Sequence, residues 1–293
     1  MIFYGSIPAV ITPFQTNHEI DYDSLAKHID FLISEGSNGL VSCGTTGESP
    51  TLSHDEHRAV TEFIIKRSNG KVPVMAGCGS NSTKESVEFV KHAYKAGASA
   101  SLLVAPYYNK PTQKGLYEHF KIISQSCDKL GVYLYNIPGR SVVKINSDTI
   151  KKLTKFKNIL GVKDATADLT TPLDVRKHCG EKFQQLSGED ATFLSFLISG
   201  GNGCISVTAN VTPRICSEIY KLWVSREIDK AMKLNFKLYN LNNVLFSESS
   251  PGPVKYALSK MKKCKNILRP PLVNVEEVTE KLINSALHEL KII

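Results

Sequence analysis

The stretch Ile159-Leu160-Gly161-Val162-Lys163-Asp164 decides the fold class of this chain, because a short apolar run ends abruptly in charged residues. A run of this length with β-branched residues is typical of a strand buried on both faces, as in a parallel sheet. Lys163 and Asp164 then close the strand, at the end where α/β folds carry their reactive groups. The rest of the chain repeats this pattern.

Seven further short apolar runs alternate with longer amphipathic stretches. Leu25, Ile29 and Leu32 are spaced to share one helix face. Ser-x-x-Glu capping boxes at Ser53 and Ser82 predict two helix starts. The eight predicted strands are residues 6–12, 39–42, 72–77, 100–104, 132–136, 159–164, 184–187 and 203–207. Eight strand–helix units predict an α/β protein with a (β/α)8 TIM barrel over residues 1–225. A doubly wound sheet is the alternative, but no G-x-G-x-x-G follows the first strand.

Residues 226–293 are predicted to form a C-terminal helical extension. Apolar residues recur there at intervals of three and four, which indicates a helix with one apolar seam. The seam consists of Ala231, Leu234, Leu238, Leu241 and Leu245. Two more helices are expected to start near Pro253 and near Val275. Because no flexible linker precedes them, we expect all of these helices to pack on the barrel.

The composition is that of an ordinary globular protein and excludes several classes. The 293 residues are 42% hydrophobic and 22% charged, too apolar for a disordered chain. No apolar run approaches the roughly 18 residues of a membrane span, and no secretory signal precedes the first strand. The seven cysteines are scattered without a CxxC pair, which argues against a disulfide framework and a thiolate zinc site. We therefore expect a cytoplasmic protein without a membrane partner.

The formal net charge of +8 has two interpretations. One is attraction of an anionic partner, either nucleic acid or small acids. The other is a lysine-rich solvated surface. The densest cluster lies near the end of a predicted helix, where the helix dipole favours cations without any partner. It consists of Lys260, Lys262, Lys263 and Lys265. Since no nucleic-acid-binding motif accompanies it, no nucleic-acid partner is expected.

Polar residues follow four of the predicted strands at their carboxyl ends. They are Gly44–Glu48, Ala105–Thr112, Tyr135–Arg140 and the pair at 163–164. Strand ends of a barrel meet at one mouth, so we expect these groups to converge there.

Lys163 is the most informative of these residues. Lysines are seldom fully buried, because burial disfavours the ammonium form. A neutral amine attacks a ketone carbonyl to form an imine, so a buried lysine at a strand end is a candidate nucleophile. The alternative is an ion pair with a neighbouring carboxylate such as Asp164. Position alone does not decide between them.

The neighbouring groups each have a chemical and a structural interpretation. Tyr135 ends the strand before Lys163 and could pass protons, or be a core tyrosine with a bonded hydroxyl. The Gly44–Gly47 loop offers hydroxyls and backbone N–H groups to a small carboxylate or phosphate, or is a structural turn. Arg140 could offer a bidentate fork to a second carboxylate, or be a solvated surface arginine.

Five segments together give the chain a specific resemblance. They are GTTGE at Gly44–Glu48, PYYNKPTQ at Pro106–Gln113, YNIPGR at Tyr135–Arg140, GVKDA at Gly161–Ala165 and GNGCISVTANV at Gly201–Val211. The chain resembles the dihydrodipicolinate synthase (4-hydroxy-tetrahydrodipicolinate synthase) family, which includes N-acetylneuraminate lyase and related pyruvate aldolases. The likeness runs from about Gly5 to the C-terminal helices.

The resemblance implies a lyase that condenses pyruvate with L-aspartate 4-semialdehyde, in diaminopimelate and lysine biosynthesis. Lys163 would form the Schiff base with pyruvate, while Thr45 and Thr46 would hold its carboxylate. A proton relay would consist of Thr46, Tyr135 and Tyr108, the last reaching across from a neighbouring subunit. The family uses no metal or other cofactor and is typically a homotetramer built as a dimer of dimers.

The resemblance also implies contacts around these groups. Arg140 would bind the carboxylate of the semialdehyde, and Gly188 and Ile205 would line the pyruvate pocket. Six further residues match the positions at which lysine-sensitive members bind L-lysine as an allosteric effector: Ser49, His54, His57, Asn81, Glu85 and Tyr107. Simpler readings exist, since Glu85 fits a capping box and His54 and His57 could decorate a helix turn. A metal pair at the two histidines lacks a third ligand.

Three other functions compete with this one. Another class I pyruvate lyase, such as N-acetylneuraminate lyase or 2-keto-3-deoxygluconate aldolase, would not need a carboxylate fork at Arg140. A non-catalytic keto-acid sensor on a barrel scaffold would have little use for a proton relay. A nucleic-acid-binding role rests on the net charge alone.

Overall fold

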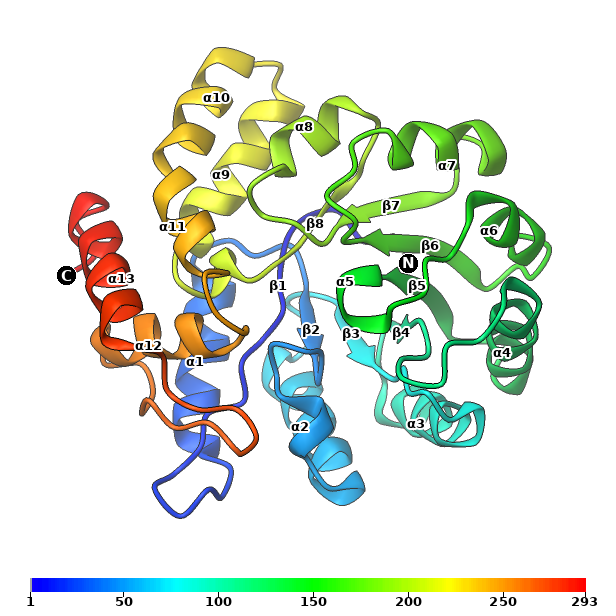
Figure 1. Cartoon of the computed structure of the whole chain (residues 1–293), viewed down its shortest axis with the longest axis horizontal. Coiled ribbons are helices and arrows are strands. Elements are labelled where there is room, and N and C mark those ends of the chain that lie inside the picture. The colour runs from blue at the N-terminus through cyan, green and yellow to red at the C-terminus, as the bar shows by residue number, and fades with distance from the viewer. Residues whose placement is uncertain (1) are drawn as a thin grey trace.

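The computed structural model describes residues 2–293 and contains one closed ring of parallel strands surrounded by helices (Figure 1). The eight strands are β1 (Gly5–Pro8), β2 (Leu40–Ser42), β3 (Val74–Gly77), β4 (Ala100–Val104), β5 (Gly131–Asn136), β6 (Ile159–Asp164), β7 (Gln184–Ser187) and β8 (Gly203–Ser206). Neighbouring strands pair in parallel from β2 through β8 and back to β1. An isolated parallel bridge between Ala9 and Val41 joins β1 to β2 and completes the ring. The predicted TIM barrel is confirmed.

Helices connect successive strands on the outside of the ring (Figure 1). The helices before the C-terminal extension are α1 (Tyr22–Ser34), α2 (His54–Ser68), α3 (Thr83–Ala96), α4 (Gln113–Ser126), α5 (Pro138–Ser141), α6 (Ser147–Leu153), α7 (Thr171–Cys179), α8 (Phe193–Ile198) and α9 (Pro213–Val224). Short 3-10 turns η1 (Ser49–Thr51) and η2 (Thr208–Asn210) follow β2 and β8. The first predicted strand was too long, because β1 ends at Pro8 and only the single bridge at Ala9 continues it.

The two predicted capping boxes have different outcomes. Ser53 caps α2 in full: its hydroxyl accepts the Glu56 N–H, and the Glu56 carboxylate accepts the Ser53 N–H. Ser82 caps α3 with its hydroxyl, but its own N–H donates to Ser80. The capping-box role predicted for Glu85 is therefore wrong, and its carboxylate is turned towards α2 instead.

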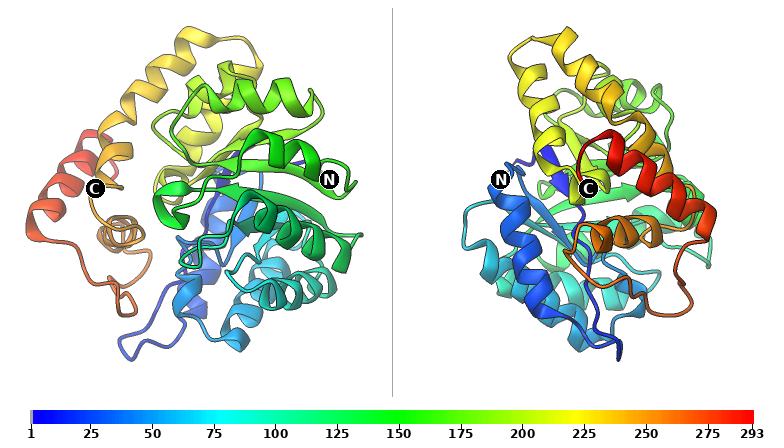
Figure 2. Two further views of the ribbon diagram at one scale, coloured as in Figure 1. Left: turned by 45° about the vertical axis from the view of Figure 1, so that its right-hand side comes forward. Right: turned by 90° about the vertical axis from the view of Figure 1, so that its left-hand side faces the viewer.

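Four helices follow α9 along one side of the barrel (Figures 1 and 2). They are α10 (Ile228–Lys237), α11 (Tyr239–Val244), α12 (Gly252–Lys260) and α13 (Glu277–Glu289). The predicted apolar seam is divided between two helices, since Leu238 separates α10 from α11. One core cluster contains residues from both sides of residue 225, among them Cys204, Leu241 and Ile283. Burial of shared apolar surface thus holds these helices against the barrel.

The barrel interior is filled at one end and hollow at the other. A cluster of Phe3 with strand residues such as Met75, Tyr133 and Leu186 packs the amino-terminal end. The ring of Tyr133 meets that of Phe3 edge to face, with centroids 5.7 Å apart. The carboxyl-terminal end therefore remains as the place where a cavity can form. Within residues 2–293, no helix has both the length and the apolar character needed to cross a membrane.

Candidate active site

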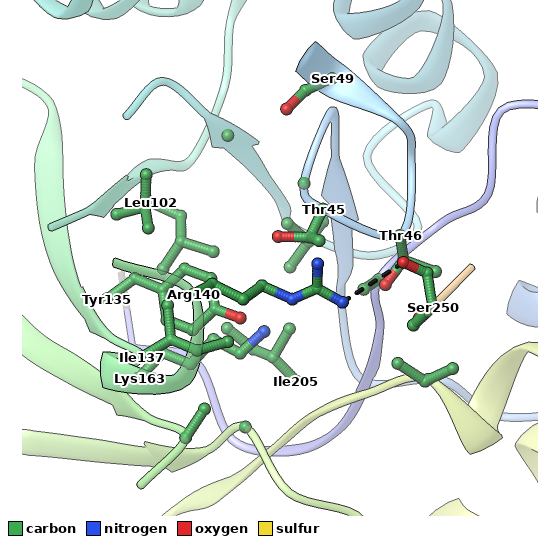
Figure 3. A pocket seen from close by; sticks show the side chains of 18 of the residues that line it. Thr45, Thr46, Ser49, Leu102, Tyr135, Ile137, Arg140, Lys163, Ile205 and Ser250 are labelled. Atoms are coloured by element: carbon green, nitrogen blue, oxygen red, sulfur yellow. Dashed lines mark hydrogen bonds between the residues drawn. The ribbon is translucent and has the colours of Figure 1, made fainter. Parts of the chain in front are cut away.

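A cavity of about 470 Å³ opens at the carboxyl-terminal mouth of the barrel (Figure 3). Side chains from the ends of several strands and from the α11–α12 loop line it. The seven predicted lining residues that it brings together are Thr45, Thr46, Tyr135, Arg140, Lys163, Gly188 and Ile205. Tyr108 is absent from that lining.

Lys163 lies in the wall of this cavity and is only 7% exposed. Parallel pairing of β5 with β6 sets Tyr135 beside it, and Nζ lies 4.1 Å from the centroid of the Tyr135 ring. Successive side chains of a strand point to opposite faces. The Asp164 side chain accordingly points away from the cavity, and its carboxylate accepts a hydrogen bond from the Thr166 N–H at 3.0 Å. None of the ion pairs within residues 2–293 involves Lys163.

Gly188 shapes the space around the lysine by having no side chain. A Cβ atom at this position would lie 2.8 Å from Lys163 Cε and 2.7 Å from the Ala165 Cβ. Such contacts are far inside van der Waals distance, so any larger residue would displace the lysine stem. The Gly188 N–H donates to the Asp164 carbonyl at 2.6 Å, which fixes the turn.

Two carboxylates follow Gly188 and contribute negative charge near Lys163. Asp190 is buried and accepts the Val207 and Thr208 N–H groups at 2.8 and 3.1 Å, so it holds the loop after β8. Glu189 lines the cavity. Burial raises the pKa of both carboxyls, while the nearby Lys163 acts in the opposite direction.

The loop from Gly44 to Glu48 forms a tight turn at the cavity edge. The Gly47 N–H donates to the Gly44 carbonyl at 3.1 Å, and the Glu48 N–H donates to the Thr45 carbonyl at 3.0 Å. The Thr12 hydroxyl donates to the Gly47 carbonyl at 2.7 Å. Thr45 and Thr46 project from this turn, and Thr46 is almost fully buried. Their hydroxyls give the cavity a polar wall that suits a small carboxylate.

Arg140 extends across the mouth from the short helix α5. Its Nη2 donates to the Ser250 carbonyl at 3.3 Å, a contact that links α5 to the α11–α12 loop (Figure 3). Ser249, Ser250 and Phe246 of that loop also line the cavity. A single long hydrogen bond leaves most of the guanidinium fork available for an anionic ligand.

Tyr108 is carried away from the cavity by its own loop. The side chain is 89% exposed, and the backbone has a left-handed φ of 69°. Positive φ is uncommon outside glycine and costs energy, so it persists only where the surrounding structure holds it. Within residues 2–293, the tyrosine lines neither the mouth cavity nor the second cavity described next.

A second cavity of about 610 Å³ adjoins the first. It gathers all six residues predicted for an effector: Ser49, His54, His57, Asn81, Glu85 and Tyr107. Thr45, Ser49 and Arg140 line both cavities, so the two share a wall. The Asn81 amide donates to the Tyr107 carbonyl at 3.2 Å, which ties the loops after β3 and β4 together.

The histidines of the second cavity make different contacts. His54 Nε2 lies 2.7 Å from Glu85 Oε1. His57 stacks on Phe89 with ring centroids 4.1 Å apart, and its Nε2 lies 2.9 Å from the Gly77 carbonyl. Burial lowers the pKa of His57 to about 4, so the ring is neutral at pH 7. Since Nε2 must then carry the proton, Nδ1 is an acceptor, and it has no partner in the described part of the chain.

Neither cavity has the donor set of a metal centre. Residues 2–293 contain no group of three or more histidine, cysteine, aspartate or glutamate side chains placed to share a metal ion. The seven cysteines are all free thiols.

Comparison with known proteins agrees with this geometry. Residues 2–290 match the Dihydrodipicolinate synthetase family. The chain belongs to this family. A 4-hydroxy-tetrahydrodipicolinate synthase of Bradyrhizobium diazoefficiens is 52% identical over 285 residues, which are 97% of this chain and 96% of that protein. The predicted resemblance is confirmed.

Solved structures of the family superimpose on the whole chain. The chloride inhibited dihydrodipicolinate synthase from Acinetobacter baumannii, complexed with pyruvate, has a TM-score of 0.97 and 41% identity over 100% of both chains. DHDPS from Cyanidioschyzon merolae with lysine bound has a TM-score of 0.96 and 32% identity over 99% of both chains.

Several cavity residues were missed by reasoning from the family segments. Glu189 could have been found, because it lies two residues after a predicted strand end. The C-terminal extension contributes Phe246, Ser249 and Ser250. No strand is predicted in the extension, so the rule that site residues follow strand ends could not identify them. Their place at the mouth depends on how the extension folds back.

Proposed function

We propose that this chain is a 4-hydroxy-tetrahydrodipicolinate synthase, which condenses pyruvate with L-aspartate 4-semialdehyde through a Schiff base on Lys163. The observation that carries the proposal is the Lys163 amine beside Tyr135 in the mouth cavity, where no carboxylate of the described residues forms an ion pair with it. The match to the family and the pyruvate complex of the Acinetobacter baumannii neighbour support it. We assign catalysis to the barrel of residues 1–225 and a supporting role to the extension of residues 226–293.

The first half of the reaction makes a carbon nucleophile from pyruvate. The Lys163 amine adds to the ketone carbon, and loss of water gives the iminium ion. Thr45 and Thr46 hold the pyruvate carboxylate in the polar wall, with Gly188 and Ile205 packed around the small ligand. Removal of a methyl proton then gives the enamine. Thr46, Tyr135 and Tyr108 relay the protons.

The second half joins the two substrates. The enamine carbon attacks the aldehyde carbon of the semialdehyde, whose carboxylate pairs with the Arg140 fork. The amino group of the semialdehyde then attacks the iminium carbon, which closes the ring and releases the Lys163 amine. Arg140 at the mouth favours this acidic substrate over the sugar substrates of other pyruvate lyases. The name of the Bradyrhizobium diazoefficiens relative supports the same choice.

A second copy of the chain is proposed to supply Tyr108. Within residues 2–293, Tyr108 lines neither cavity, and its 89% exposed side chain is accessible to another subunit. This arrangement makes the dimer the smallest active unit. We propose the homotetramer, a dimer of dimers, as the complete assembly.

L-lysine is proposed as an effector that binds the second cavity. Glu85 offers a carboxylate and His57 Nδ1 an unpartnered acceptor, which together suit an ammonium group. Thr45 and Ser49 line both cavities, so a ligand bound in the second cavity would contact residues that also line the substrate cavity. The lysine-bound Cyanidioschyzon merolae neighbour supports this ligand. Cytoplasmic localisation is proposed because all seven cysteines are free.

Covalent trapping tests the proposal directly. Borohydride added with pyruvate should reduce the iminium ion and leave one three-carbon adduct per subunit on Lys163, located by peptide mass spectrometry. Lys163→Arg should take up no adduct and lose activity in an assay coupled to a downstream reductase. An adduct on another lysine, or none in active enzyme, would refute the mechanism.

A further inference from the structure

A fully buried ion pair connects the substrate loop to the C-terminal extension. Glu48, the last residue of the loop, and Lys255 of α12 are both 0% exposed as side chains. The Lys255 Nζ donates to Glu48 Oε1 at 2.5 Å. Neither residue lines the mouth cavity, but Glu48 belongs to the same loop as Thr45 and Thr46, which do.

The surroundings of the pair satisfy its remaining groups. Glu48 Oε2 accepts the backbone N–H of Arg269 at 3.0 Å. Lys255 Nζ lies 4.2 Å from the centroid of the Phe14 ring, and the Arg269 guanidinium lies 4.5 Å from the same centroid. The Arg269 side chain then forms a bidentate pair with Glu56 in the first turn of α2. The extension thereby contacts both the Gly44–Glu48 loop and α2, the helix that carries His54 and His57.

A fully buried ion pair is better suited to fixing the orientation of its side chains than to stabilising the fold. Burial lowers the pKa of Lys255, and the Glu48 charge acts against this shift. The desolvation cost of two buried charges offsets most of their attraction, so the net gain in stability is small. The two oxygens of Glu48 nonetheless have separate partners, Lys255 and the Arg269 N–H, which together orient its carboxylate. Glu48 has a left-handed backbone with φ 54°, which persists only where its surroundings hold it.

Glu48 lies in the chain between Thr45 and Ser49, two residues that line both cavities. It follows Thr46 by two residues and directly precedes Ser49, and its N–H closes the turn on the Thr45 carbonyl. We propose that Glu48 and Lys255 are positioning residues, which act through Thr45 and Thr46 to aim the loop at the substrate carboxylate. This inference rests on the proposed function, since it assumes that pyruvate binds there.

The test separates positioning from stability with a double variant. Glu48→Gln or Lys255→Met alone leaves one buried charge without a partner, so each should lower the melting temperature. Glu48→Gln/Lys255→Met removes both charges, keeps an acceptor for the Arg269 N–H, and should restore folding. Its half-saturation for pyruvate in borohydride trapping should still rise about tenfold or more, the effect of misplacing a hydrogen bond to a carboxylate. The KM for the semialdehyde should change far less.

Two further variants complete the design. Lys255→Arg keeps the charge but alters the reach, and should also weaken pyruvate binding while the protein stays folded. Lys281→Met removes an exposed ion pair to Glu277 and serves as the matched control with wild-type kinetics. Unchanged pyruvate half-saturation in the folded double variant and in Lys255→Arg would overturn the inference. Failure of both to fold would overturn it too, because the pair would then be a folding requirement. If wild type itself traps no pyruvate on Lys163, the proposed function fails instead.

Discussion

Replacing Arg140 with alanine tests which second substrate the mouth of the barrel accepts. In the free protein the guanidinium donates one hydrogen bond of 3.3 Å, from Nη2 to the Ser250 carbonyl. A bound carboxylate would instead receive two parallel, charge-assisted hydrogen bonds. The variant therefore loses the fork to the substrate and, in the free state, one weak contact to the α11–α12 loop.

The expected loss follows from the difference between these two states. A bidentate pair to a charged carboxylate contributes roughly 2–4 kcal/mol, and the Ser250 contact that it replaces about 1 kcal/mol. The net loss of about 1–3 kcal/mol corresponds to a fall of about 5- to 150-fold in kcat/KM for the semialdehyde. Arg140→Lys keeps the charge without the fork, so its kcat/KM should lie between those of wild type and the alanine variant.

The assay couples product formation to a downstream reductase, with pyruvate saturating and the semialdehyde varied. Borohydride trapping of pyruvate on Lys163 should survive in both variants, which shows that the loss concerns the second substrate alone. Equal kcat/KM for wild type and Arg140→Ala would refute the carboxylate fork. Loss of pyruvate trapping in Arg140→Ala would assign the arginine to the first substrate instead.

Three other outcomes are expected. Tyr108→Phe should lower kcat by about 10²-fold or more. Mixing this variant with Lys163→Ala should restore activity, because one site of each mixed dimer has Lys163 from one subunit and Tyr108 from the other. A lack of recovery on mixing would contradict a shared relay. L-lysine should inhibit wild type only partially, and not purely competitively with pyruvate, because allosteric coupling is typically about 1–3 kcal/mol. Glu85→Gln should be less sensitive to L-lysine than wild type. Equal sensitivity of the two proteins would exclude this cavity as the site. Burial lowers the pKa of His28 to about 4, below its unfolded value, so its contribution to stability is present above about pH 6.5 and is lost as the pH falls towards 4. Between pH 7 and pH 5, the free energy of unfolding measured with denaturant should fall by about 2 kcal/mol more in wild type than in His28→Leu. An equal fall in the two proteins would disprove this prediction.

The barrel and much of its site follow from local patterns in the sequence. Strand β6 was predicted at its observed bounds, and so was β7, because short apolar runs between amphipathic helices leave few alternatives. The rule that reactive groups follow barrel strands then placed Lys163, Tyr135 and Arg140 at one mouth. These predictions succeed because side-chain direction along a strand or helix is set by backbone periodicity.

Packing between distant segments decided the rest. Whether Lys163 paired with Asp164 was open in the sequence, and strand geometry turned the two side chains to opposite faces. Glu85 fitted a capping box, but its carboxylate meets His54 from a neighbouring helix. Glu48 and Lys255 are 207 residues apart and meet only because α12 folds back against the barrel. Periodicity specifies which face of an element is buried, whereas the partner across that face depends on how the closed barrel and the extension pack together.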